Sequence, residues 1–367
     1  MRYFFSTGEA SGELSATLLA AQIAARDPDA RFDGVGAQRM REFGFNLWAS
    51  TRGWSSILPF SVLLRIPQVL AAWSLTLRRL AKEPPSVIVL VDFGAFNLRL
   101  AAALRRRRYP GAIIYFFPPG AWFDDPEQAR AVATYTVPVP GFEHQADFYR
   151  GLGLEAHYFG HPLASCYQMR EARPRPPRDA GTIALLPGSR AAELRYHVPL
   201  LFDALRELRR VRPALEACVV PADDEAEATL ARAARARKVP LRLVRGTKEA
   251  LINADAAWIA SGTAVLEAAL LGVPAIAFYR MSAFQMRLVR YAYPGRYMAL
   301  SNLVANRAVV PELIQDAATP NALAAAMECL LLDPAPQYAA LQGIRAALGP
   351  RDGLERLADF VVECARG

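Results

Sequence analysis

A short segment in the second half of the chain combines residue types that hold phosphate groups. LLPGSRAAEL (185–194) passes from an apolar run through Pro-Gly-Ser-Arg into a helical pattern. Gly188 lets the backbone approach a ligand closely, and Ser189 can cap the helix. Arg190 can meet a phosphate with two parallel N–H groups. The segment therefore favours a diphosphate ligand, and the alternative is a capped helix that carries a surface arginine.

A second segment, ASGTAVLEAALLGVPAIAFYR (260–280), begins another helix with small residues. Ser261, Gly262 and Thr263 stand where free backbone N–H groups and the helix dipole attract an anion. Glu267 follows about one turn later, where its carboxylate can accept hydrogen bonds from both hydroxyl groups of a ribose. Two such helix starts in one domain favour a nucleotide site more strongly than either does alone.

The first half of the chain offers a loop and a carboxylate. STGEASGE (6–13) places Gly8 and Gly12 at the head of a helix, where an anion or a polar sugar can bind. Its glycine spacing matches neither GxGxxG nor a P-loop, and a plain tight turn is the alternative. Asp92, in VDFGAFN (91–97), ends an apolar strand. It is placed for a general base or, equally, for capping the next helix.

These segments belong to a repeated pattern in which a short apolar strand leads through a turn into an amphipathic helix. Such alternation predicts α/β domains with doubly wound parallel sheets. The pattern stops in REARPRPPRDAG (170–181) and then restarts. We predict a first domain over 1–168, a linker over 169–181 and a second domain over 182–339, with helices in 340–367 returning to the first domain. Because such sheets bind ligands beyond the carboxyl ends of their strands, both domains are expected to face a central cleft.

The composition limits the classes of function. Among 367 residues, 53% are hydrophobic and 21% are charged, which suits two folded domains. The net charge of +8 favours anionic partners, but dispersed arginines and no recognised nucleic-acid module argue against nucleic acid. The sequence shows no CxxC pair, signal peptide or long uncharged apolar run. We therefore expect a cytoplasmic protein without a metal site, disulfides or a spanning helix, and the oligomeric state stays open.

One stretch, YRMSAFQMRLVRYAYPGRYMALSNLV (279–304), mixes arginines with aromatic and aliphatic residues and contains no acid. An anionic lipid surface attracts such cations by about 1 kcal/mol each, and aromatic side chains suit the interface. The apolar segment 57–73 suits the same role, and a solvated helix is the alternative. The residues that we expect to contact a membrane are Phe284, Arg287, Arg290, Tyr291 and Arg296.

Several collinear blocks between about residues 7 and 320 resemble the lipid-A-disaccharide synthase family. They are GEASGE, FDGVGAQRM, VDFGAFNLRLA, FGHPLAS, LLPGSRAAEL, ASGTAVLEAALLGVPAIAFYR and LSNLVANRAVVPELIQD. The resemblance implies the two-domain GT-B architecture and an inverting glycosyltransferase that needs no metal or other cofactor. It implies transfer from UDP-2,3-diacylglucosamine to 2,3-diacylglucosamine 1-phosphate, which releases UDP and forms the β-linked disaccharide of lipid A. It also implies a peripheral place on the cytoplasmic face of the inner membrane.

The resemblance also assigns roles to single residues. Asp92 resembles the base that takes the proton of the acceptor hydroxyl, and Arg190 resembles the arginine at the diphosphate. Asn302 resembles the active-site asparagine, in SNL where the family usually has PN. The remaining matches line the same cleft or the nucleotide: Gly8, Ser11, Gly12, Gly188, Ser189, Ser261, Gly262, Thr263, Glu267, Glu312 and Gln315.

The first half also departs from the family pattern. Acids replace part of an aromatic segment around Trp122, Ala95 stands where a second aspartate is common, and SSIL (55–58) replaces a methionine–glycine element. Because these changes concern the acceptor side, two alternatives stay open. One is a GT-B transferase with a different lipid acceptor, and the other is a non-catalytic, membrane-peripheral binder of sugar lipids or nucleotides. A UDP-sugar 2-epimerase would need a cluster of acids and histidines that the sequence does not show.

Overall fold

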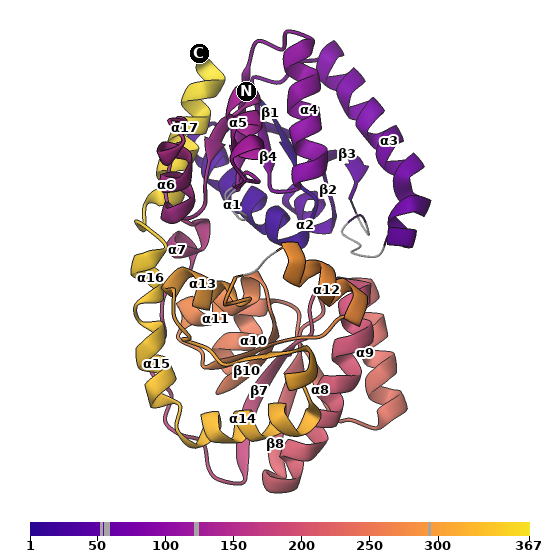
Figure 1. Cartoon of the computed structure of the whole chain (residues 1–367), viewed down its shortest axis with the longest axis vertical. Helices are drawn as coiled ribbons and strands as arrows, with labels where there is room; N and C mark the ends of the chain where they lie inside the picture. The colour runs from indigo at the N-terminus through magenta and orange to yellow at the C-terminus, as the bar shows by residue number, and fades with distance from the viewer. Residues whose placement is uncertain (52–53, 55–58, 121–124, 293–294) are drawn as a thin grey trace. The chain divides into compact units, whose positions relative to one another are not determined.

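A computed structural model describes residues 1–51, 54, 59–120, 125–292 and 295–367 (Figure 1). The chain forms two compact units: residues 1–166 together with 348–367, and residues 167–347. The predicted first domain ends at residue 168 and regains the chain at 340, whereas the structure has these boundaries at 166 and 348.

The segment 169–181, predicted as a linker, is part of the second unit. Arg170 donates to the carbonyl oxygen of Ile252 at 2.7 Å, and Arg173 donates to that of Asn253 at 3.0 Å. The Pro- and Arg-rich composition that suggests a free connection therefore belongs to an irregular segment that hydrogen bonds fasten to a folded unit.

The first unit is built on a parallel sheet in the order β3-β2-β1-β4-β5-β6. Its central strands are apolar throughout because helices cover both faces. Along one strand, Tyr3 and Phe5 point into one core and Phe4 points into the other. The strands are β1 (Arg2–Ser6), β2 (Arg31–Gly36), β3 (Asn46–Ser50), β4 (Val87–Val91), β5 (Ala112–Phe116) and β6 (Val137–Val139). The helices are α1 (Ala10–Arg26), α2 (Gln38–Phe43), α3 (Pro59–Lys82), α4 (Gly94–Arg106), α5 (Pro126–Tyr135), α6 (Glu143–Gly151), α7 (Pro162–Cys166) and α17 (Gly353–Arg366).

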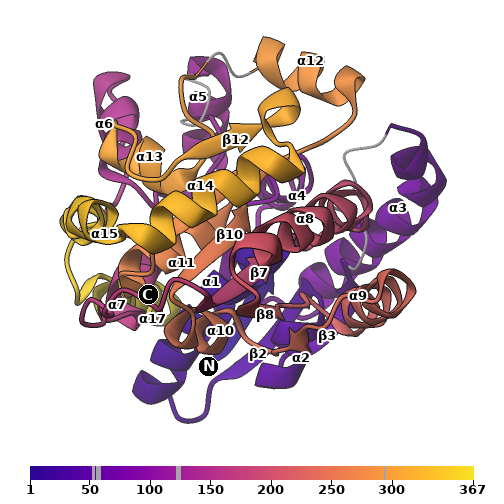
Figure 2. The same ribbon diagram turned by 90° about the horizontal axis from the view of Figure 1, so that it is seen from below.

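The second unit has a parallel sheet in the order β12-β11-β10-β7-β8-β9. Helices α8 and α14 lie side by side over one face of it and bury Trp258 beneath them (Figure 2). The strands are β7 (Ala180–Leu186), β8 (Ala214–Val219), β9 (Arg242–Leu243), β10 (Ala256–Ala260), β11 (Ala275–Tyr279) and β12 (Glu312–Ile314). The helices are α8 (Ala191–Val211), α9 (Asp224–Arg237), α10 (Thr247–Asn253), α11 (Thr263–Leu271), α12 (Ala283–Ala292), α13 (Leu300–Ala305), η1 (Gln315–Ala317), α14 (Pro320–Leu332), α15 (Ala335–Leu341) and α16 (Ile344–Ala347).

Both sheets share one topology. When the strands of each unit are counted from its own first strand, both sheets read 3-2-1-4-5-6. The strand order reverses between β1 and β4 in the first unit and between β7 and β10 in the second. Doubly wound sheets bind ligands at such switch points, beyond the carboxyl ends of the strands. The predicted fold class of doubly wound parallel α/β domains is confirmed.

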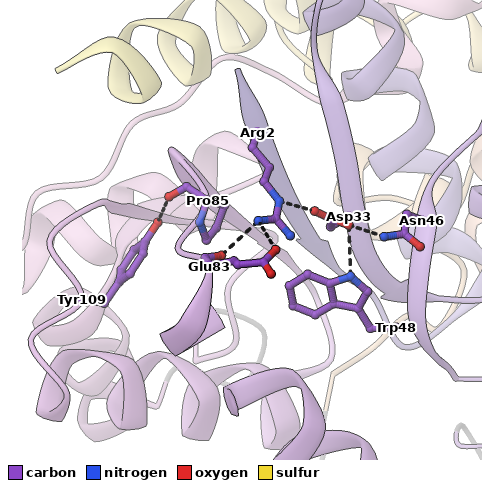
Figure 3. A network of polar contacts seen from close by, with 7 residues as sticks. All are labelled: Arg2, Asp33, Asn46, Trp48, Glu83, Pro85 and Tyr109. Atoms are coloured by element: carbon purple, nitrogen blue, oxygen red, sulfur yellow. Dashed lines mark hydrogen bonds and ion pairs between the residues drawn. The ribbon is translucent and has the colours of Figure 1, made fainter. Parts of the chain in front are cut away.

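A polar network holds the outer strands of the first sheet together (Figure 3). The buried carboxylate of Asp33, within β2, accepts from Arg2 Nε at 2.6 Å on one oxygen. Its other oxygen accepts from Asn46 at 2.6 Å and from the indole N–H of Trp48 at 3.0 Å. Arg2 also pairs with Glu83 at 3.0 Å. Because both oxygens are paired, this strand tolerates a buried acid, and the network links β1, β2 and β3.

Candidate active site

The two predicted helix starts of the second unit lie next to each other. β7 and β10 pair with Leu186 beside Ile259, so the loops that follow them leave the same edge of the sheet. One loop leads into α8 and the other into α11. Because the strand order reverses here, the loops flank the position where doubly wound sheets hold phosphates. The structure brings together the predicted residues Gly188, Ser189, Arg190, Ser261, Gly262 and Thr263.

In the first loop, a carboxylate of the protein takes two of the predicted phosphate donors. Glu193 Oε2 accepts from the backbone N–H groups of Ser189 at 2.8 Å and of Arg190 at 3.1 Å. Gly188 has a φ of +104°, and a Cβ there would lie 2.2 Å from Oε2, so glycine allows this approach. The prediction that Ser189 caps α8 is wrong, because Arg190 is the N-cap residue and Glu193 satisfies the loop.

Glu193 also orients the arginine. Its Oε1 lies 3.3 Å from Nη1 of Arg190 and accepts from the hydroxyl of Tyr279 at 2.8 Å. Burial, reinforced by the charge of Glu193, raises the pKa of Tyr279, so this hydroxyl stays a donor at neutral pH. The guanidinium of Arg190, whose side chain is 25% exposed, is thus what this loop presents to an anion.

The second loop keeps the anion-attracting end of a helix. Gly262 is the N-cap residue of α11, which runs from Thr263 without a side-chain cap, and residues 261–263 are partly exposed. The hydroxyl of Ser261 donates to the carbonyl oxygen of Met298 at 2.7 Å. That side chain therefore fastens the loop, and the start of α11 offers its backbone and dipole.

Glu267 lies one turn into α11, as predicted, but its side chain is buried, with 6% of the residue exposed. Its carboxylate accepts from the hydroxyl of Tyr167 at 2.5 Å. The ammonium group of Lys248 lies 5.6 Å from the centre of the Tyr167 ring. The predicted ribose contact would therefore require a ribose hydroxyl to share Glu267 with Tyr167.

Asn302, predicted to act at the substrate, is instead a buried brace with 1% of its surface exposed. Its amide N–H groups bind the carbonyl oxygen of Val310 at 2.9 Å and Glu312 Oε1 at 2.7 Å. Its oxygen accepts from the N–H groups of Val309 at 2.7 Å and Val310 at 2.9 Å. The amide has used its donors and its acceptor within the protein, so it shapes the segment and does not reach a ligand.

Glu312 and Gln315 also bind the protein's own backbone. Glu312 accepts from the N–H groups of Met298 at 2.9 Å and Ala299 at 3.1 Å. Gln315, with a φ of +55°, accepts from the N–H of Met281 at 2.8 Å and donates to its carbonyl oxygen at 3.1 Å. Glu312 thus supports the residue that anchors Ser261, and Gln315 clamps the loop after β11.

Asp92 leaves β4 at the switch point of the first unit, and its side chain is exposed. Asp92 and Phe93 have φ values of +50° and +56°, which non-glycine residues rarely adopt. The amide of Asn97 and the hydroxyl of Tyr115 donate to the carbonyl oxygen of Asp92 at 2.8 and 2.9 Å. Phe93 is the N-cap residue of α4, so the capping alternative for Asp92 is not what the structure shows.

The loop after β1 meets the loop after β4. A Cβ on Gly8 would lie 2.2 Å from the ring of Phe93, so the glycine is needed for this contact. Ser11 lies partly exposed in the first turn of α1, and Gly12 is buried behind it. Asn97 accepts from the hydroxyl of Ser6 at 2.6 Å and so joins both loops.

Sequence reasoning missed Asn97, Glu193, Tyr279 and His197. Each lies within a quoted motif or one turn beyond it, but each acts by hydrogen bonds to residues that only the fold brings near.

Part of the predicted membrane surface is described. On α12, Phe284 is 63% exposed and Arg287 is exposed, while Met286 is buried. Arg296 is exposed above the ring of Tyr297, at 5.4 Å from its centre. The side chains of Arg290, Tyr291 and Ala95, together with residues 55–58 and Trp122, lie outside the described residues. No described helix combines the length and the hydropathy needed to cross a bilayer.

Comparisons with known proteins agree along the whole chain. The lipid-A-disaccharide synthetase family matches residues 3–348. The lipid-A-disaccharide synthase of Myxococcus xanthus is 35% identical over 380 residues, covering 99% of this chain and 97% of that protein. That of Pseudomonas aeruginosa (strain UCBPP-PA14) is 32% identical over 372 residues, covering 99% and 98%.

Solved structures show the same fold at low identity. The UDP-GlcNAc 2-epimerase of Methanocaldococcus jannaschii, in complex with UDP-GlcNAc and UDP, has a TM-score of 0.64 at 12% identity, covering 99% of this chain and 100% of that chain. WaaG, a glycosyltransferase involved in lipopolysaccharide biosynthesis, has a TM-score of 0.53 at 14% identity, covering 98% and 99%. The architecture is GT-B. The chain belongs to the lipid-A-disaccharide synthase family and is a glycosyltransferase of lipid A biosynthesis.

Proposed function

We propose that the chain transfers 2,3-diacylglucosamine from UDP to 2,3-diacylglucosamine 1-phosphate, with inversion at the donor carbon and without a metal. The observation that carries the proposal is the exposed carboxylate of Asp92 at the first unit's switch point, on a strained backbone held by Asn97. The start of α11 and Arg190 support a diphosphate leaving group in the second unit. The epimerase solved with UDP-GlcNAc and UDP supports a UDP-sugar on this fold.

In the proposed step, Asp92 takes the proton of the acceptor hydroxyl while that oxygen bonds to the donor's anomeric carbon. The bond from this carbon to UDP breaks, and UDP keeps the electron pair. Attack from the face opposite UDP turns an α-linked donor into a β-linked product. Negative charge grows on the departing diphosphate, and the α11 dipole and the guanidinium of Arg190 stabilise it.

The function is tested by incubating the protein with UDP-2,3-diacylglucosamine and a panel of lipid acceptors, followed by mass analysis of products. We expect release of UDP and a phosphorylated disaccharide with 2,3-diacylglucosamine 1-phosphate, unchanged by a metal chelator. Product with another acceptor alone would contradict the acceptor, and loss of product with the chelator would contradict metal independence. UDP binding without any transfer would favour the non-catalytic alternative.

We also propose a peripheral place on the anionic cytoplasmic face of the inner membrane, where diacylated substrates reside. Exposed Phe284 and Arg287 on α12 support this, as do Ile66 and Leu70 on α3, which are 40% and 59% exposed. We expect flotation with anionic vesicles at low salt and weaker flotation at high salt. A protein that stays at the bottom of the gradient at low salt would contradict this proposal.

A further inference from the structure

A histidine that the proposed reaction does not use joins two loops of the second unit. His197 lies on α8, one turn after Glu193, and is fully buried. Its Nδ1 lies 2.7 Å from the carbonyl oxygen of Pro187, in the loop after β7. Its Nε2 accepts from the backbone N–H of Arg280, after β11, at 3.0 Å. The ring also packs against Phe278 and Tyr279, with centres 5.0 and 4.9 Å away.

These two loops stand on either side of the start of α11. In the sheet, β10 lies between β7 and β11, so the loop that begins α11 has the Pro187 loop on one side and the Arg280 loop on the other. The first of these carries Arg190, and the second is clamped at Met281 by Gln315. We propose that His197 is a positioning residue, which fixes both loops at the spacing that the diphosphate of the donor requires. This inference rests on the proposed UDP site.

The bonding pattern sets the state of the ring. A carbonyl oxygen can only accept, so Nδ1 carries a hydrogen, and Nε2 then accepts from Arg280 as the second nitrogen of a neutral imidazole. Burial lowers the pKa of His197, which keeps it neutral at pH 7. The ionisable side chains that face it are Glu193 on α8 and Tyr279 on β11, with Arg190 attached to Glu193 and the exposed side chain of Arg280 on the adjoining loop.

Protonation would change the contact to the second loop. A charged ring would donate from Nε2, so the N–H of Arg280 would lose its acceptor, and the carbonyl oxygen of Arg280, also 3.0 Å away, would become the partner. The loop after β11 would have to rotate for this exchange. We therefore expect the affinity for UDP to fall with pH below about 6.5, because the folded pKa lies below that ordinary value.

The test compares His197→Phe, His197→Gln and wild type by calorimetric titration with UDP from pH 5 to pH 8. Phenylalanine fills the ring volume without either hydrogen bond, and we expect about tenfold weaker UDP binding at pH 7, equivalent to the loss of one to two hydrogen bonds. Donor KM should rise more than kcat falls, because the proposed base is elsewhere. Glutamine keeps an acceptor near Nε2, so His197→Gln should bind more tightly than His197→Phe.

The pH profile separates positioning from a merely structural role. Because a phosphate of UDP itself titrates near about pH 6, the wild-type profile is read against that of His197→Gln, which has no proton to gain. Wild type should lose affinity more steeply below pH 6.5. The control His157→Gln, at a partly exposed histidine of the first unit, should match wild type.

The outcomes are distinct. If His197→Phe binds UDP like wild type, or if His197→Gln reproduces the wild-type profile, the positioning role is overturned. If His197→Phe does not fold, the glutamine profile decides alone. If wild type itself does not bind UDP at pH 7, the proposed function fails, and the failure is visible before any variant is compared.

Discussion

Asp92 is held on a backbone that costs energy to maintain. Two consecutive left-handed residues, Asp92 and Phe93, cost on the order of 1–3 kcal/mol each, and such strain persists only where the surroundings enforce it. Asn97 and Tyr115 both donate to the Asp92 carbonyl oxygen, and Asn97 is itself bound to Ser6. The direction of the carboxylate is therefore set before a substrate arrives, which favours a role in chemistry over one in stability.

Replacing Asp92 with asparagine tests this at the scale of one proton. The amide keeps the shape of the side chain but cannot accept the hydroxyl proton, so we expect kcat to fall about 10²- to 10⁴-fold. The Kd for UDP should stay unchanged, because UDP is proposed to bind the second unit. Steady-state release of UDP and a UDP titration measure the two quantities. Asp147→Asn, an exposed aspartate paired with Arg150 in the same unit, is the matched control, and wild-type turnover in Asp92→Asn would exclude it as the base.

The sequence could nominate polar residues near the site but could not tell which of them face a ligand. Asp92, Arg190 and the start of α11 were found because a strand end followed by glycine and a polar residue is a local pattern. Asn302 was found by the same reasoning, yet its amide binds Val309, Val310 and Glu312. A backbone N–H and a ligand hydroxyl make the same demand on a side chain, and only the fold decides which one it meets.

The two helix starts of the second unit are satisfied in different ways. α8 receives a carboxylate from its own first turn, Glu193, whereas α11 begins at Gly262 without a side-chain cap. An anion approaching this edge therefore meets the dipole of α11 and the guanidinium of Arg190, while the loop before α8 is fixed by Glu193. The element that holds the charge and the element that orients the arginine are separate.

Alanine at Gly188 tests how the loop before α8 depends on Glu193. The new Cβ would lie 2.2 Å from Oε2 and displace the carboxylate, so the N–H groups of Ser189 and Arg190 would lose their acceptor. Gly246→Ala is the control, because its φ of +105° matches the +104° of Gly188 while its nearest neighbour is 4.0 Å away. Both variants suffer backbone strain. We expect Gly188→Ala to lose about 1–3 kcal/mol more free energy of unfolding, measured by urea denaturation, and to bind UDP more weakly.

Equal losses in the two variants would show that the carboxylate adds nothing to the loop.

Some elements were predictable and others were not, for physical reasons. Buried parallel strands are apolar on both faces, so β1, β4, β5, β7 and β10 stand out as short apolar runs. β2 was not predicted because Asp33 interrupts it, and its acid is acceptable only with Arg2, Asn46 and Trp48 around it. β6 and β12 have three residues each, too few for a pattern.

The whole chain repeats one topology, but the two units are built differently along the sequence. The second unit is continuous from residue 167 to 347, whereas the first needs residues 348–367 to be complete. Helix α17 returns to pack along α1 and buries an apolar face in the core beneath β1, β4 and β5. The residues that it buries are Leu354, Leu357, Ala358, Val361 and Val362.

A chain that ends at residue 347 should therefore lose the first unit and keep the second. Burying each large apolar side chain of α17 contributes roughly 1.5–3 kcal/mol, so the helix supplies an amount comparable to the roughly 5–15 kcal/mol that stabilises a whole domain. We expect limited proteolysis to digest residues 1–166 while 167–347 resists, and UDP binding to persist because its proposed ligands lie in the second unit. The full-length variant Glu355→Ala, on the exposed face of α17, should resist throughout. Equal resistance of both units after truncation would mean that the core of the first unit is stable without its last helix, and loss of both would mean that the second unit cannot fold without the first.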